Sequence, residues 1–129
     1  MANNDLDKDF LDTQKQRLID LKGELERLRD GLEEDQRLRG DQEEDLTEHD
    51  AGDLSQSVFD REMDATVEGQ VERRLHDVER ALEKIEEGTY GICDDTGEEI
   101  PKGRLEAVPE AIRTVEAQQH FERERRPPA

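Results

Sequence analysis

The sequence predicts a mainly α-helical protein in which a long antiparallel helical hairpin, a coiled coil, precedes a small unit made of a β-hairpin and a helix. Three observations predict it: two stretches repeat apolar residues at helical spacing, an acidic stretch joins them, and the helical spacing stops at Gly88. With 30% hydrophobic and 3% aromatic residues, the 129-residue chain has little material for a large core. A helical pair suits that composition because it needs to bury only one seam.

The first helix is indicated by leucines that recur at alternating steps of three and four, while charged residues fill the outer positions. Gly40 is a plausible end for this helix. The expected seam residues are Leu11, Leu18, Leu21, Leu25, Leu28 and Leu32.

The second helix is indicated by the same alternation, preceded by apolar residues at steps of four. It is expected to begin near Asp53 or Ser55 and to end at Gly88, with Gly69 as a weak point where the spacing changes. The two seams are expected to bury each other, so residues 1–87 form the hairpin. The apolar positions are Phe59, Met63 and Val67, then Val71, Leu75, Val78, Leu82 and Ile85.

An acidic connection joins the two helices. Residues 33–53 hold ten carboxylates and two basic side chains, and Gly40 and Gly52 supply bends. The tip of the hairpin is therefore expected near residues 37–53. A solvated connection without a function is the alternative that composition alone leaves open.

Residues 88–129 are expected to form the small second unit. A turn at residues 94–97 implies a β-hairpin, and a last helix is expected over roughly residues 110–125. Its core is expected to consist of Tyr90, Ile92, Ile100, Leu105, Val108, Ile112 and Val115.

Charge and composition narrow the function classes. A formal charge of -18 repels phosphate, so direct nucleic-acid binding is not expected, whereas a basic protein surface is a suitable partner. No run approaches the roughly 18 apolar residues of a membrane span, and the N-terminus does not resemble a leader, so a cytoplasmic protein is expected. The single Cys93 excludes an internal disulfide.

No nucleophile–base set or phosphate-binding glycine loop suggests an enzyme.

Several short motifs occur together between residues 50 and 118, namely Asp53-Leu54, Phe59-Asp60-Arg61-Glu62, Gly88-Thr89-Tyr90-Gly91-Ile92-Cys93, Gly97-Glu98-Glu99-Ile100-Pro101 and Arg104-Leu105-Glu106-Ala107-Val108-Pro109. In this combination, residues 50–118 resemble the DksA/TraR family, especially its stress- and sporulation-associated branch. Beyond this stretch, the N-terminal helix resembles the family only in pattern. The resemblance implies a transcription regulator whose helical hairpin enters the secondary channel of RNA polymerase.

The family's four-cysteine zinc site is degenerate in this sequence. The resemblance places its ligand positions at Cys93, Thr96, Thr114 and Ala117, so three of the four cysteines are missing. A structural zinc ion needs four nitrogen or sulfur donors, and one thiolate with the distant His120 does not supply them. We therefore expect no bound zinc, and we expect Cys93 to be a small buried residue more readily than a redox or metal site.

The resemblance also assigns the tip residues. The family's Asp-x-x-Asp-x-Ala motif falls on Asp50, Asp53 and Ser55, with serine in place of alanine. In the family these acidic residues act near the catalytic centre of the polymerase and alter initiation. The simpler interpretation of Asp50 and Asp53 is a loop residue and a helix N-cap, and Asp53 can serve both roles.

Two further interpretations stay open. In the first, the chain is an interaction or stress protein that no longer binds polymerase, and its seam pairs with another chain. The hairpin predicts a monomer instead, so a monomeric protein would argue against that pairing. Calcium binding by the acidic connection is disfavoured because residues 41–53 lack the spacing of an EF-hand loop.

Overall fold

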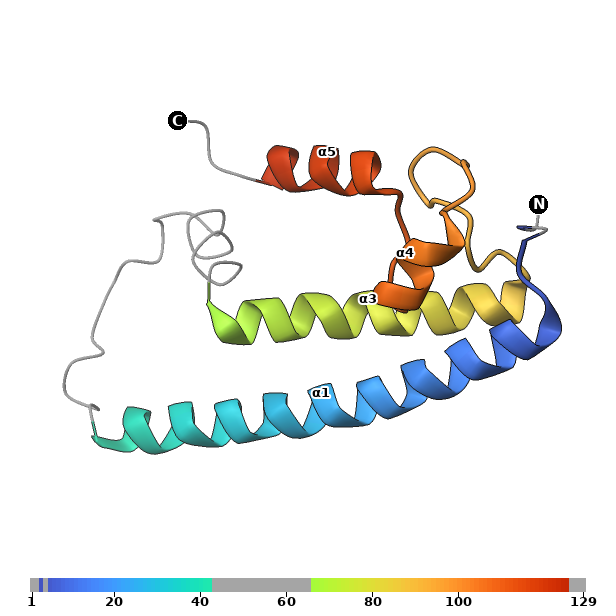
Figure 1. Cartoon of the computed structure of the whole chain (residues 1–129). Helices are drawn as coiled ribbons and strands as arrows, with labels where there is room; N and C mark the ends of the chain where they lie inside the picture. The colour runs from blue at the N-terminus through green and yellow to red at the C-terminus, as the bar shows by residue number, and fades with distance from the viewer. Residues whose placement is uncertain (1–2, 4, 43–65, 126–129) are drawn as a thin grey trace.

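The computed structural model describes residue 3, residues 5–42 and residues 66–125, and its elements are all helices. Figure 1 shows α1 (Lys8–Gln42) and α3 (Val67–Glu87) side by side and antiparallel, with α5 (Val115–Arg125) across α3 from α1. The short α4 (Lys102–Ala107) contacts the N-terminal part of α1, since Lys102 Nζ lies 4.9 Å from the centroid of the Phe10 ring. The prediction of a mainly helical fold with a helical hairpin is therefore confirmed. Residues 88–125, which follow α3, are here called the C-terminal unit.

The two helices bury most of the seam that the heptad spacing predicts. Leu28 and Val67 are 48% and 60% exposed, so their assignment to the buried seam is wrong. Ridges of side chains from the two helices exclude water between them, which stabilises the pair through apolar burial. The buried apolar residues are Leu18 and Leu25 from α1 and Val71, Leu75, Val78 and Ala81 from α3, with Leu11, Leu21, Leu32, Leu82 and Ile85 partly buried.

Both ends of α3 are capped. Thr66 is extended (φ -87°, ψ 163°), and its hydroxyl accepts a hydrogen bond from the Gly69 N–H at 2.9 Å. Gly88 ends the helix in the left-handed conformation (φ 80°), as expected of a C-terminal glycine. Asp53 and Ser55, the expected start of the second helix, lie outside the described residues. A single helix running from them to Gly88 is nevertheless wrong, because Thr66 interrupts it.

The expected β-hairpin is reduced to one isolated antiparallel bridge between Ile92 and Glu99 among the described residues. Gly91 and Gly97 have positive φ angles of 89° and 77°, which extended strands do not adopt. Pro101 follows and has no N–H to donate to a ladder. The ladder therefore cannot lengthen on either side of the turn.

The last helix begins later than predicted. Residues 110–112 are buried in an irregular connection, and α5 starts at Val115 after Thr114, whose hydroxyl accepts the Ala117 N–H at 3.2 Å. Val115 is half exposed, so its assignment to the core is wrong. Among the other expected core residues, Tyr90, Ile100, Leu105 and Ile112 are buried, and Ile92 and Val108 are partly buried.

None of the described helices is both long enough and apolar enough to cross a membrane.

Candidate functional site

The tip residues assigned from sequence, Asp50, Asp53 and Ser55, lie outside the described residues, as does most of the acidic connection. The described helices nevertheless fix where that connection attaches. With 35 residues against 21, α1 extends beyond the start of α3, and the segment joins both helices at the end away from α4 (Figure 1). The hairpin therefore carries its acidic connection at the end opposite Gly88, where the C-terminal unit begins (Figure 1).

The four positions that correspond to zinc ligands, here called the vestigial cluster, are Cys93, Thr96, Thr114 and Ala117. Cys93 is 2% exposed and Ala117 is buried. Burial acts to raise the pKa of Cys93, but hydrogen bonds from the Thr96 side chain and from backbone groups, among them that of Thr114, outweigh it and lower the pKa. Ala117 joins through its N–H, which donates to the Thr114 hydroxyl. Hydrogen bonds thus link all four positions.

The side chains of the vestigial cluster do not fit zinc. They offer one thiolate, two hydroxyls and a methyl group, whereas a structural zinc ion needs four nitrogen or sulfur donors. His120 forms an exposed ion pair with Glu124, with Nε2 and Oε1 3.1 Å apart. Within residues 5–42 and 66–125, no group of three or more His, Cys, Asp or Glu side chains is arranged to hold a metal ion.

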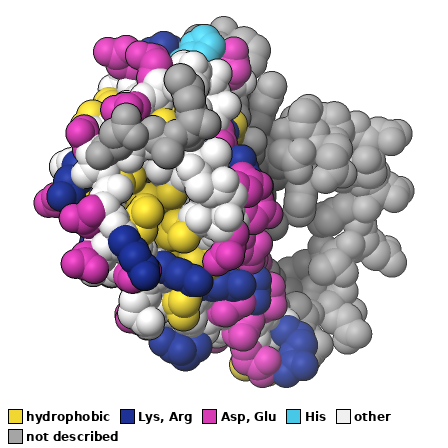
Figure 2. Space-filling model, turned by 90° about the vertical axis from the view of Figure 1, so that its right-hand side faces the viewer, with side chains coloured by type: hydrophobic (Ala, Val, Ile, Leu, Met, Phe, Trp, Pro, Cys, Tyr) yellow, Lys and Arg dark blue, Asp and Glu magenta, His cyan; other side chains and the backbone are white. Residues whose placement is uncertain are grey.

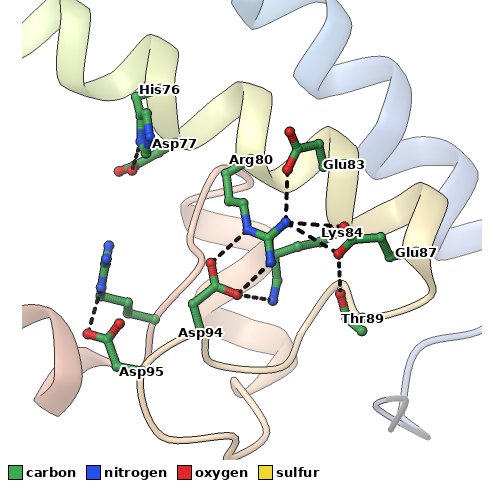
Figure 3. Close-up of polar contacts among 10 residues, drawn as sticks. His76, Asp77, Arg80, Glu83, Lys84, Glu87, Thr89, Asp94 and Asp95 are labelled. Carbon is green, nitrogen blue, oxygen red and sulfur yellow. Dashed lines mark hydrogen bonds and ion pairs between the residues drawn. The ribbon is translucent and has the colours of Figure 1, made fainter.

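Next to Cys93, the carboxylate of Asp94 binds two basic side chains of α3, an arrangement here called the Asp94 clasp (Figure 3). Lys84 Nζ donates to Asp94 Oδ1 at 2.6 Å, and Arg80 Nε and Nη2 donate to the two carboxylate oxygens at 2.9 and 3.2 Å. The Lys84 side chain is only 2% exposed, so this carboxylate neutralises a buried cation.

Protonation of Asp94 is opposed by the same contacts. Burial acts to raise the pKa of Asp94, but the hydrogen bonds from Arg80 and Lys84 outweigh it and hold the pKa below its ordinary value. Arg74 forms a second ion pair between α3 and the C-terminal unit, with Nη2 2.9 Å from Glu110 Oε2. Ion pairs at Asp94 and Glu110 therefore join the C-terminal unit to α3.

The N-terminal residues also contact the C-terminal unit. Asn3 is buried, and its Nδ2 donates to the carbonyl oxygens of Gly91 and Ile100, each at 3.1 Å. Gly91 has a positive φ of 89°, and a Cβ atom there would lie 2.7 Å from Leu6 Cδ1 and 3.1 Å from Asn3 Cβ, so backbone conformation and space both favour glycine. Figure 2 faces this end of the molecule and shows hydrophobic side chains between basic and acidic ones.

Sequence reasoning missed Asn3 and Lys84. Asn3 has no local signal, because its partners are 88 and 97 residues away. Lys84 has a weak signal, since Arg80 and Lys84 are four residues apart and share a helix face. In a chain with 43% charged residues, such pairs are too common to single one out.

Comparisons with known proteins agree with this architecture. Residues 88–123 match the model of the prokaryotic dksA/traR C4-type zinc finger. General stress protein 16O of Bacillus subtilis is 54% identical over 65 residues, which cover 50% of this chain and 40% of that protein. The RNA polymerase-binding transcription factor DksA of Caulobacter vibrioides is 36% identical over 112 residues, covering 87% of this chain and 75% of that protein.

A solved structure extends the match to the whole fold. The RNA polymerase binding protein and transcriptional regulator Dks of Chlamydia trachomatis superposes with a TM-score of 0.59 at 30% sequence identity. The superposition covers 92% of this chain and 93% of that one, so it includes both the hairpin and the C-terminal unit. By its sequence and its fold, the chain belongs to the DksA/TraR family.

Proposed function

We propose that this chain is a non-enzymatic transcription regulator that binds RNA polymerase through the secondary channel, where its acidic tip acts near the active centre. The observation that carries the proposal is the α1–α3 hairpin with its acidic connection at the end opposite Gly88. The names of the Caulobacter and Chlamydia relatives, both of which state polymerase binding, support it.

Physical chemistry favours a protein channel over free nucleic acid as the partner. The formal charge of -18 repels phosphate groups, whereas carboxylates suit a bound Mg²⁺ ion or basic residues of a channel wall. A helical pair is about 20 Å wide, since each helix with its side chains measures roughly 10–12 Å across. Such a rod can carry carboxylates into a narrow passage. The tip contacts that we propose are Asp50, Asp53 and Ser55.

We further propose that the protein acts as a monomer without zinc. The seams of α1 and α3 bury each other, so the hairpin needs no second chain to cover its apolar face. The vestigial cluster lacks the donors for zinc, and internal hydrogen bonds and ion pairs occupy the residues around it.

Transcription in vitro with purified bacterial polymerase tests the tip. Asp53→Asn removes one charge and leaves a side chain that still accepts a hydrogen bond, so binding should remain near the wild-type level while the effect on transcription is lost. Asp12→Asn is the matched control, because this exposed residue lies near the start of α1, at the opposite end of that helix from the acidic connection. Unchanged promoter output with Asp53→Asn would refute the role of the tip. Absence of binding by the wild type would instead favour an interaction or stress protein that does not bind polymerase.

A further inference from the structure

A glutamine occupies a buried position of the α1 seam. Gln14 lies three residues after Leu11 and four before Leu18, where the heptad spacing calls for an apolar residue. It is nevertheless 1% exposed. A buried amide must find partners for its donors and acceptor, since leaving them unpaired costs free energy.

The partners of Gln14 come from the C-terminal unit. Its Nε2 donates to the Tyr90 hydroxyl at 3.0 Å and to the Leu105 carbonyl oxygen at 2.8 Å. The Tyr90 hydroxyl donates in turn to the Pro109 carbonyl oxygen at 2.8 Å. The remaining polar atom of Gln14, Oε1, accepts from Arg17 Nη1 at 2.8 Å. One side chain thus joins α1 to three separate points of the C-terminal unit, directly or through Tyr90.

We infer that Gln14 is a positioning residue that fixes the C-terminal unit in a single orientation on the hairpin. A leucine at this position would also be buried, but apolar contacts are non-directional, and several packing arrangements satisfy them. Hydrogen bonds are directional, and buried polar residues specify register in other helical assemblies. The inference concerns the fold alone and stands apart from polymerase binding.

Tyr90 gives a direct test, because it is the only tyrosine in a chain without tryptophan. Its fluorescence therefore reports one site, which is 3% exposed. We would compare Gln14→Met with the matched control Gln16→Met, an exposed position two residues further along the same helix. Methionine keeps the length and the helix propensity of glutamine but donates no hydrogen bond.

The expected result is a severalfold increase in acrylamide quenching of Tyr90 in Gln14→Met at 25 °C, with the helical circular dichroism unchanged. Gln16→Met should match the wild type in both measurements. Unchanged quenching in Gln14→Met would overturn the inference. Loss of the helical signal in Gln14→Met would also overturn it, because Gln14 would then hold the whole fold and not an orientation.

The pKa of Tyr90 provides a second readout. It shifts in opposite directions depending on whether the C-terminal unit reorients or stays in place in Gln14→Met. Burial raises the pKa of Tyr90 to about 12, and the hydrogen bond with Gln14 partly offsets this increase. If the C-terminal unit reorients in Gln14→Met, Tyr90 gains solvent and its pKa falls toward the ordinary value of about 10. If the unit stays in place, loss of the hydrogen bond moves the pKa further up. A rapid pH jump followed by tyrosine absorbance measures the difference, and an upward shift would contradict the inference.

Discussion

Replacing Asp94 with asparagine should loosen the attachment of the C-terminal unit to α3. The substitution keeps the shape of the side chain but removes the charge that neutralises Lys84, whose Nζ lies 2.6 Å from Asp94 Oδ1. It also removes the paired charge contacts of Arg80, at 2.9 and 3.2 Å. The buried ammonium of Lys84 is then left without a carboxylate partner.

The burial of the three groups sets the size of the effect. Removing one partner of a fully buried ion pair costs about 3–5 kcal/mol, whereas an exposed pair contributes about 0–1 kcal/mol. Lys84 is 2% exposed, but Asp94 and Arg80 are 21% and 31% exposed, so the clasp lies between these limits. We expect the free energy of unfolding to fall by about 2–3 kcal/mol, or roughly 8–12 °C in Tm for a chain of this size.

Thermal unfolding followed by circular dichroism at pH 7 measures this loss. Asp30→Asn is the matched control, since that side chain is 69% exposed, and it should leave Tm nearly unchanged. Adding Lys84→Met to Asp94→Asn should restore part of the lost stability, because the unpaired buried charge is then gone. A Tm for Asp94→Asn equal to that of the control would refute the reasoning.

Four other predictions follow from named contacts. Because the pKa of Asp94 lies below its ordinary value of about 3.9, the clasp stabilises the fold above that pH and is lost as pH falls through the folded-state pKa. The Tm difference between wild type and Asp94→Asn should therefore shrink from pH 7 to about pH 3, and a constant difference would contradict this assignment. Leu25→Asp places a charge at a seam position that is 4% exposed, so the free energy of unfolding measured with urea should fall by about 4 kcal/mol or more. Ile19→Asp is the control, and it should change that free energy little because Ile19 is 46% exposed. Gly91→Ala should lower the free energy of unfolding by about 3 kcal/mol, because the new Cβ would lie 2.7 Å from Leu6 Cδ1. Gly97→Ala should lower it by only about 1 kcal/mol, because Gly97 has a positive φ but no neighbour within 4 Å. Equal losses in the two variants would argue against the close contact at Gly91. Incubation with a strong chelator should leave the wild-type Tm unchanged, and a large fall would show a metal that the vestigial cluster does not explain.

Periodicity predicted the hairpin because a heptad seam is a local pattern that directly determines which helix face is buried. Leu18, Leu25 and Leu75 follow that rule. Leu28 departs from it by being half exposed. Gln14 departs in the opposite sense, since hydrogen bonds to distant residues of the chain compensate its burial. Tertiary contacts of this kind leave no periodic trace in sequence.

The C-terminal unit was predicted less accurately because turns and caps determine its structure. The Ile92–Glu99 bridge is too short for strand periodicity to describe. The start of α5 depends on the cap at Thr114 and not on the apolar residues before it, several of which are buried without being helical. Cys93 and Thr96 show that a resemblance can indicate which residues meet, although the sequence does not reveal the hydrogen bonds that join them. The assignment of Asp50 and Asp53 to the tip stays a prediction.

The most direct test of the proposed function is a pull-down of purified bacterial RNA polymerase with the wild-type chain, in the presence and absence of a factor known to occupy the secondary channel. The proposal predicts binding at micromolar concentration that the competing factor abolishes. Absence of binding at that concentration, or binding that the competitor leaves unchanged, would contradict it.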